Sequence, residues 1–268
     1  MRWWSALGVL LAVVLAAGMT ACSGPASAQT GDCVEQSGDT SYTRIDCAGA
    51  QLRVLERIEG TDADCTAVPG VTQSFTDYSS DYSLCLGPLD VDPAAAVNVA
   101  QVGDCLSGVD AGSGQGGDDV HRVDCADPAA GAQVISRQED VFELGFECDD
   151  VPGTTATYAW SLDTTSSTGI ITTDIDSTDV LFCLGPAGVD PATSPDTAQA
   201  GDCLRETGDP TGYAKVDCGA PDAAYRVVER VDVPFIGVDL ACGDVPAATG
   251  GIQSQGGLDG YVLCIAPN

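Results

Sequence analysis

The alternation of apolar and polar positions along the chain predicts short β-strands. Apolar and β-branched residues gather around Ile45, Val54, Val134 and Val227, and Gly, Pro, Asp and Ser bound each of these segments. Short apolar runs between turn-forming residues are typical of strands, and no long stretch shows the period of an amphipathic helix. We therefore expect α+β, β-rich domains with small antiparallel sheets, in which a further strand or one short helix follows each Val-Pro.

The same elements recur three times in one order. The opening segment at 28–33 ends in Gly-Asp-Cys and returns at 100–105 and 198–203. In each copy an Asp-Cys segment, a valine-rich segment, a Cys-x-x-Val-Pro segment and a closing cysteine strand follow. Five elements that recur in order indicate tandem duplication. The chain then divides into repeat 1 (28–88), repeat 2 (100–186) and repeat 3 (198–268).

The linkers at 89–99 and 187–197 also resemble each other, since both contain Val-Asp-Pro-Ala. Recent duplication explains this likeness without any structural requirement, and an ordered joint between the repeats is the alternative. Loops inside the repeats vary widely in length. The longest, at 153–179 in repeat 2, is rich in Thr and Ser, and surface loops of this kind tolerate insertions best.

The cysteines follow the same division, with four in each repeat and Cys22 outside them. Domains of this size bury little apolar surface, and disulfides in an oxidising compartment are the usual means of stabilising them. Four cysteines allow three pairings, among which the sequence does not decide. The preferred pairing joins the first to the second and the third to the fourth: Cys33–Cys47, Cys65–Cys85, Cys105–Cys125, Cys148–Cys183, Cys203–Cys218 and Cys242–Cys264.

The first residues have the order of a secretory signal peptide. A positive Met1-Arg2 start precedes an uncharged apolar run at 3–18, and Met19-Thr20-Ala21-Cys22 follows. This end resembles the lipobox of bacterial lipoproteins, with Met19 where Leu is usual. We expect a signal peptide at 1–21, a lipid on Cys22, a tether at 22–27 and anchoring at the outer face of the cytoplasmic membrane. Cleavage after Ala28 by ordinary signal peptidase and retention of the run as an anchor are the alternatives.

The charge of the chain excludes some classes of partner. With 40 acidic and 10 basic residues, the formal net charge is −30. Such a surface repels nucleic acid phosphates and anionic lipid headgroups, so we expect no nucleic acid partner. The acidity does not indicate disorder, because 44% of the residues are hydrophobic and no long run of one sign occurs.

The residue pattern gives little support to metal or catalytic chemistry. A zinc knuckle needs two closely spaced cysteines, but the closest pair within any repeat is Cys33 and Cys47. Aspartate directly precedes the first two cysteines of each repeat, and its charge opposes the thiolate that redox catalysis uses. His121 is the only histidine, and the acidic run at 174–179 lacks the glycine and terminal glutamate of a helix-loop-helix calcium site. We expect no catalytic residue, metal or cofactor.

The cations are the most regular candidate for binding. On a strand, Arg53 and Arg57 would share one face about Leu55, as would Arg226 and Arg230 about Val228. The repeat-equivalent cations could form a stripe that recognises an anionic group, and the alternative, which we favour, is that each pairs with a nearby acid and covers the edge of the core with its aliphatic stem. The positions proposed for binding are Arg44, Arg57, Arg122, Arg137, Lys215 and Arg230.

The motifs of each repeat resemble those of actinobacterial LppU-type lipoproteins and of the related septum-formation domain family. They are a Gly-Asp-Cys opening, a Val-x-Cys strand and a following valine-rich strand, in a chain with an expected export signal and lipid. The resemblance covers each repeat, from Ala28 to the C-terminus. Septum-formation domains often have Pro-His soon after the second cysteine, whereas this chain has Ala-Gly-Ala-Gln at 48–51 and no Pro-His in the other copies. The resemblance implies a cell-envelope protein rather than an enzyme.

Three functions are compatible with these features. The first is a non-catalytic envelope lipoprotein that binds another exported protein or a cell-wall component through its repeats. The second is an extracytoplasmic enzyme, such as a glycan hydrolase, which would need a carboxylate pair in a cleft of one repeat. The third is a passive surface spacer. Tethering, repetition and the lack of a catalytic set favour the first.

Overall fold

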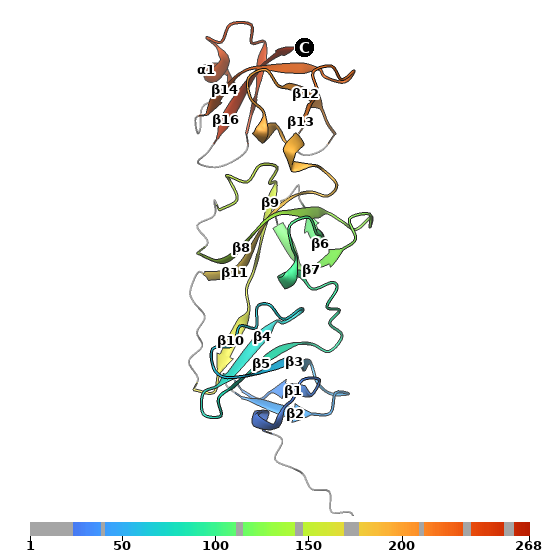
Figure 1. The fold of residues 1–268 in the computed structure, drawn as a ribbon, viewed down its shortest axis with the longest axis vertical. Coiled ribbons are helices and arrows are strands. Elements are labelled where there is room, and N and C mark those ends of the chain that lie inside the picture. Colours follow the sequence, from blue (N-terminus) through green and yellow to red (C-terminus); the bar gives the residue numbers. More distant parts are fainter. Residues whose placement is uncertain are drawn as a thin grey trace, which may run out of the picture.

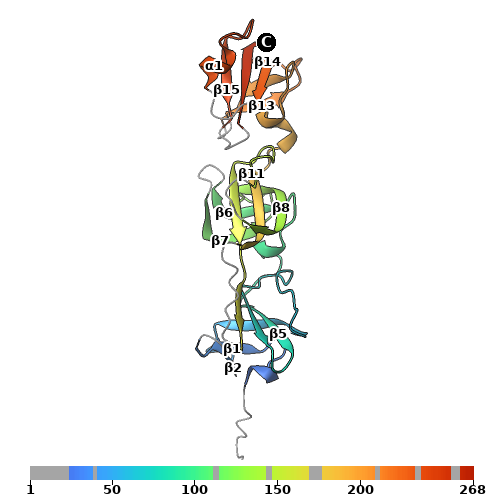
Figure 2. The ribbon, with the colours of Figure 1, turned by 90° about the vertical axis from the view of Figure 1, so that its left-hand side faces the viewer.

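The computed structural model describes residues 24–268 apart from 39–40, 111–114, 143–146, 169–176, 209–211, 233–236 and 255–259. The described part is β-rich and forms three separate, mainly antiparallel sheets, one for each repeat. Two views at right angles show the repeats in a row, from the blue N-terminal end to the C-terminus at the other end (Figure 1 and Figure 2). The predicted fold class is confirmed.

The three repeats share one strand order, in which the first strand lies between the second and third and the fifth pairs with the third and fourth. The strands of repeat 1 are β1 (Cys33–Gln36), β2 (Tyr42–Ile45), β3 (Leu52–Glu59), β4 (Gln73–Asp77) and β5 (Tyr82–Pro88). Those of repeat 2 are β6 (Cys105–Asp110), β7 (Gln115–Val123), β8 (Ala132–Phe142), β9 (Ala156–Trp160) and β11 (Ser177–Pro186). Those of repeat 3 are β12 (Cys203–Glu206), β13 (Tyr213–Val216), β14 (Tyr225–Asp232), β15 (Gly250–Gln253) and β16 (Tyr261–Pro267).

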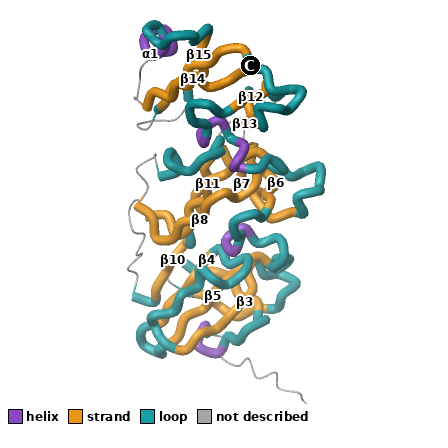
Figure 3. The backbone as a smooth tube through the Cα atoms, turned by 45° about the horizontal axis from the view of Figure 1, so that its top comes forward, coloured by secondary structure: helices purple, strands orange, loops and turns teal. Residues whose placement is uncertain are grey.

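Helices are short and lie outside the sheets, as the backbone tube shows (Figure 3). The 3-10 helices are η1 (Pro25–Ser27), η2 (Val97–Val99), η3 (Pro191–Thr193) and η4 (Pro195–Thr197), and the α-helix is α1 (Val238–Cys242). The Val-Pro segments are each followed by a strand, β4, β9 or β15, which is one of the two expected outcomes. The helix α1 instead precedes the Val-Pro of repeat 3, and it ends at Cys242.

One strand of repeat 2 belongs to the sheet of repeat 1. β10 (Asp163–Ser166) lies in the long loop of repeat 2 and adds in parallel to β4 at the edge of the first sheet. Only two residues separate the end of β9 from the start of β10, so the chain passes directly from one sheet to the next. The expectation of a tolerant surface loop is therefore wrong for this segment, which has a fixed place in a neighbouring sheet.

A β-bulge recurs in the third strand of each repeat. In β3, Val54 opposes Leu86 and Glu56 opposes Cys85, which leaves Leu55 as the extra residue. Because a bulge shifts the alternation of side chains by one, Arg57 lies over Tyr82, whose ring belongs to the same buried cluster as Val54. The expected common face of Arg53 and Arg57 about Leu55 is therefore wrong. The same shift occurs at Ile135 and Val228.

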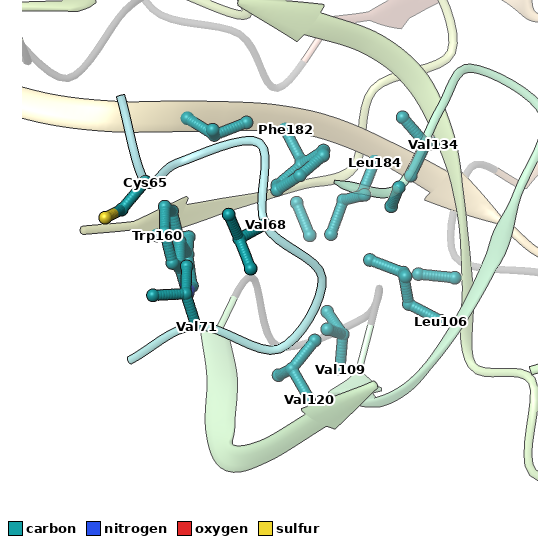
Figure 4. Close-up of a cluster of buried hydrophobic side chains, with 14 of the residues drawn as sticks. Cys65, Val68, Val71, Leu106, Val109, Val120, Val134, Trp160, Phe182 and Leu184 are labelled. Atoms are coloured by element: carbon teal, nitrogen blue, oxygen red, sulfur yellow. The ribbon is translucent and has the colours of Figure 1, made fainter. Parts of the chain in front are cut away.

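Repeats 1 and 2 share a hydrophobic core. Val68 and Val71, which flank the Val-Pro turn of repeat 1, pack in one buried cluster with Trp160, Phe182 and Leu106 of repeat 2 (Figure 4). Repeat 1 has a second cluster of its own, which includes Val34, Phe75 and Leu84. Repeat 3 has a separate cluster, which consists of Ala198, Leu204, Val227, Tyr261, Leu263 and Ile265. The buried apolar residues thus join the first two repeats more closely than the last two.

Each repeat contains two disulfides, each of which connects a strand to a loop or, at Cys242, to the helix α1. They join the pairs that the sequence analysis preferred: Cys33–Cys47, Cys65–Cys85, Cys105–Cys125, Cys148–Cys183, Cys203–Cys218 and Cys242–Cys264. In the chain-entropy account, a bridge across a loop of about 15 residues contributes roughly 3 kcal/mol. Two such bridges are a large part of the stability available to a domain of this size.

Candidate functional site: the paired cations and the joints between repeats

The Gly-Asp-Cys opening forms a tight turn that presents its aspartate to a cation. Gly31 has a φ of 92°, a conformation that glycine adopts without strain, and the Asp32 carboxylate accepts the Gln29 amide N–H at 2.9 Å. The same carboxylate lies 3.4 Å from an Arg44 guanidinium nitrogen. The equivalent pairs are Arg122–Asp104 at 3.6 Å and Lys215–Asp202 at 3.7 Å. These are partly exposed ion pairs, which typically contribute at most about 1 kcal/mol.

The second set of cations is more deeply placed and bonds to the backbone that enters each repeat. Arg57 Nη1 donates to the Ala28 carbonyl at 3.1 Å, Arg137 Nη1 to the Asn98 carbonyl at 2.9 Å and Arg230 Nη1 to the Asp196 carbonyl at 2.8 Å. Their side chains are only 12, 14 and 17% exposed. Hydrogen bonds from charged donors contribute about 1.5–3 kcal/mol, so these three matter more to stability than the exposed pairs.

An acid and an aromatic ring complete the surroundings of each of these arginines. Arg57 pairs with Glu59 at 2.9 Å and lies 4.0 Å from the centre of the Tyr82 ring. Arg230 pairs with Asp232 at 2.6 Å and lies 4.1 Å from the Tyr261 ring. In repeat 2 the partners are Glu139 and Phe182. All six positions proposed for binding therefore have partners inside the chain, as the ion-pair interpretation expects.

The first linker is an ordered joint built on Asn98. The Asn98 side chain is buried, and its Oδ1 accepts the Gly70 amide N–H at 2.9 Å. Its Nδ2 donates to the carbonyl oxygens of Thr66 and Val68 at 2.8 and 2.9 Å. Asn98 thus holds the Val-Pro turn of repeat 1 with its side chain, while its carbonyl accepts the bond from Arg137 of repeat 2. The structure has the ordered joint that the sequence analysis kept as its alternative.

The second linker is built in the same way on Asp196. Its Oδ2 accepts the Gly153 amide N–H of repeat 2 at 2.8 Å, and its Oδ1 accepts the Tyr261 hydroxyl of repeat 3 at 2.6 Å. Burial, and next the charge of Asp196, raise the pKa of Tyr261 well above its ordinary value. The Asp196 carbonyl accepts the bond from Arg230. One residue therefore bonds to both repeats, as Asn98 does in the first joint.

Each joint contacts a glycine of the preceding repeat whose φ is positive, and at the first joint close packing also excludes a side chain. Gly70 has a φ of 77°, and a Cβ there would lie 2.0 Å from Val91 Cγ2 in the first linker. Gly153 has a φ of 81°, and a Cβ there would lie 3.4 Å from Pro191 Cα in the second linker. The second contact is looser. A hollow of about 20 Å³, close to the space that one water molecule needs, lies beside it and is lined by residues such as Ile135, Pro191 and Tyr213.

The described residues contain no metal centre, and the contacts of the one histidine lie within the sheet of repeat 2. No group of three metal-ligating side chains occurs in the part of the chain that the structure describes. His121 joins two strands, with its Nε2 at 2.9 Å from Ser107 Oγ and its Nδ1 at 2.8 Å from the Asp119 carbonyl oxygen. No carboxylate lines the hollow beside the second joint. The acidic run at 174–179 lies mostly outside the described residues, as does Cys22.

Sequence reasoning missed the joint residues and β10. A signal was present for the joints, because Asn98 and Asp196 occupy the same position, two residues before the recurring Ala-Gln. No helix in the described part of the chain is long and apolar enough to cross a membrane. Comparisons with known protein families, with curated proteins and with solved structures found no match to this chain.

Proposed function

We propose that this chain is a non-catalytic, lipid-anchored protein of the cell envelope that acts as a stiff post. Cys22 would carry the lipid at the outer face of the cytoplasmic membrane, and the repeats would extend from it toward another exported protein or a cell-wall component. The six disulfides indicate an oxidising, extracytoplasmic environment, which agrees with the export signal. The resemblance to LppU-type envelope lipoproteins supports the same assignment.

The observation that carries this proposal is the construction of the joints. Asn98 and Asp196 each bond to the repeat before and the repeat after, so the linkers hold neighbouring repeats in a set orientation. A flexible tether needs no such bonds, and flexible linkers are typically rich in Gly and Ser instead. A chain that only coated a surface would also have no need of them. A stiff chain of repeats can hold its C-terminal repeat at a distance from the lipid anchor, which a flexible chain cannot do.

Crosslinking in intact cells, followed by affinity capture of the full-length protein, tests the proposal. We expect the wild-type chain to capture a defined exported protein or wall fragment, and the Cys22→Ala variant to lose both the acyl group, by mass spectrometry, and the partner. An unrelated lipoprotein of similar abundance is the control for chance neighbours. Capture of the same neighbours by both proteins would contradict a binding role and favour a passive spacer.

A further inference from the structure

The edge of the first sheet already holds an added strand, and its contacts show what such an edge recognises. The Asp163 amide N–H donates to the Thr72 carbonyl at 3.3 Å, and the Ser167 amide N–H donates to the Thr76 carbonyl at 3.0 Å. Thr164 and Thr165 add side-chain bonds to Ser74, both at 3.1 Å. Recognition therefore comes from main-chain pairing, with hydroxyl groups supplying further bonds, which is the pattern of β-augmentation.

One side chain from the second strand of repeat 1 also bonds to β10. Tyr42 on β2 is buried, its hydroxyl bonds to Gln73 at 3.0 Å, and it forms a side-chain hydrogen bond with Thr165. β4 thus holds the added strand along its backbone, and Tyr42 of β2 adds one side-chain bond. Views from two directions place β10 next to β4 (Figure 1 and Figure 3).

The corresponding edge of repeat 3 is β15. The pairing registers are the same, since Ser74 opposes Cys85 in repeat 1 and Gly251 opposes Cys264 in repeat 3. Tyr213 on β13 occupies the position of Tyr42, because each opposes the last residue of the first strand of its repeat. Among the described strands, β15 pairs only with β16 and ends the third sheet. Repeat 3 therefore has the acceptor edge, and no described strand occupies it.

The geometry of β15 suits main-chain recognition. The Ser254 amide N–H donates to the Tyr261 carbonyl at 3.0 Å, toward the inside of the sheet. Because amide direction alternates along a strand, the Gln253 amide points the other way, toward the open edge. Gly251 packs against α1, since a Cβ there would lie 2.6 Å from Val238 Cγ1. Gln253 is the exposed residue of β15 and lies at the end of the strand away from this contact. The equivalent strand in repeat 2, β9, differs from β15 because its chain continues after two residues into β10, which is bound to the sheet of repeat 1.

We infer that β15 is the docking edge of this protein, where an extended segment of another exported protein adds a parallel strand. This inference rests on the proposed function and names the class of partner. The segment is free of proline, rich in Ser and Thr and not strongly acidic. Proline removes a ladder bond, hydroxyl groups serve on β10, and the net charge of −30 repels acidic chains. Because two residues of the acceptor strand are glycines, we expect β15 to discriminate little among the side chains of the added strand.

The strand that repeat 1 already binds supplies the probe. A peptide with the sequence of residues 161–168, Ser-Leu-Asp-Thr-Thr-Ser-Ser-Thr, is titrated into the ¹⁵N-labelled mature protein with all three repeats. We expect saturable shifts of the Gly251 and Gln253 amides and slower hydrogen exchange at Gln253. The same peptide with proline at the fifth position should not bind. Shifts confined to β9 or to no single edge, or no binding at millimolar peptide, would overturn the assignment.

A matched pair of variants tests the edge itself. Gln253→Pro removes the outward N–H without touching the bonds to β16, and proline is tolerated at sheet edges. Gln253→Ala removes the side chain and keeps that N–H. We expect the affinity for the peptide to fall about tenfold or more in the proline variant, because one hydrogen bond is lost and the proline ring hinders the approach of the peptide backbone. The alanine variant should retain the wild-type affinity.

Equal affinity of both variants would show that the peptide binds elsewhere and would overturn the inference. Unchanged amide positions on β14 and β16 verify that Gln253→Pro is folded. If this variant is not folded, the inference is tested on the wild-type protein instead, by comparing the peptide that has threonine at its fifth position with the peptide that has proline there. Failure of peptide binding would leave the proposed function open, since crosslinking reports a partner on any surface.

Discussion

Asn98 and Asp196 occupy equivalent positions, yet their neighbours require different side chains. Asn98 faces two carbonyl oxygens, so it needs the N–H groups of an amide. Asp196 faces three donors, the Gly153 amide and the hydroxyls of Ser194 and Tyr261, which suit a carboxylate. At the position of Tyr261, repeat 2 has Val180, which offers no donor. The joint residue therefore matches its surroundings, which are acceptors from repeat 1 at Asn98 and donors from both neighbouring repeats and the linker at Asp196.

Exchanging amide and acid at the joints should destabilise both. In Asn98→Asp, the buried oxygen that replaces Nδ2 would face two carbonyl oxygens with no donor between them. We expect a loss of about 3 kcal/mol in the free energy of unfolding of repeats 1 and 2. In Asp196→Asn, part of the acceptor capacity is lost, and we expect about 1 kcal/mol. Denaturant unfolding measures both. Equal, negligible effects would show that the joints do not hold the repeats.

The buried tyrosines should make the protein sensitive to alkali. Burial, and next the Asp77 charge, raise the pKa of Tyr82 to about 12, above the ordinary value of 10.0. Because the folded pKa is the higher one, the contribution of the neutral phenol is complete below pH 10 and is lost as the pH rises toward 12. We expect Tm to fall above pH 10, and to fall less in Tyr82→Phe. An identical profile for the variant would contradict this.

At the scale of elements, most strands could be predicted and β10 could not. The strands around Ile45, Val54 and Val227 are short apolar segments between turn residues, so local composition reveals them. β10 has the sequence Asp-Thr-Thr-Ser, which gives no apolar signal. Its partner β4 lies about 90 residues earlier, as the Ser74–Thr164 bond shows. The bulges could not be predicted either, because an extra residue in one strand is recognised only from its register with the partner strand.

Breaking the β10 ladder should loosen the first two repeats. The amides of Asp163 and Ser167 face β4, so alternation places the Thr165 amide on the same side. Thr165→Pro removes this donor, and we expect faster proteolysis within 161–176 and a stability loss of about 1–3 kcal/mol. Thr165→Ala keeps the amide and is the control. Cleavage of both variants at the wild-type rate would show that β10 is not held on β4.

At the scale of the whole molecule, the repeats are not equally coupled. Repeats 1 and 2 share a buried cluster and the strand β10, whereas the described contacts between repeats 2 and 3 are those of the Asp196 joint and its linker. The joint beside Gly153 also packs more loosely than the one beside Gly70. The post therefore consists of a two-repeat base and a third repeat that is connected to it by one joint.

This arrangement predicts two cooperative units. Calorimetry with the disulfides intact should resolve one transition for repeats 1 and 2 together and another for repeat 3. Hydrogen exchange should assign them, with amides of β5 and β11 exchanging together and those of β16 separately. A single transition with uniform exchange would contradict the division. Reduction of the disulfides should abolish both transitions at 37 °C, as removal of native bridges from small domains often does.

Local pattern was enough to reveal the threefold repeat, the strands with apolar residues and the division of the cysteines into three sets of four, because short-range chemistry sets each of these. Turn residues, apolar runs and cysteines leave their marks within a few positions along the chain. The bulge that turns Arg57 toward Tyr82, the joints at Asn98 and Asp196 and the crossing of β10 depended on the folded chain. Each of these features is a contact between segments that are distant in sequence. The free energy of such a contact depends on both segments being in their folded positions, so neither segment reveals it alone.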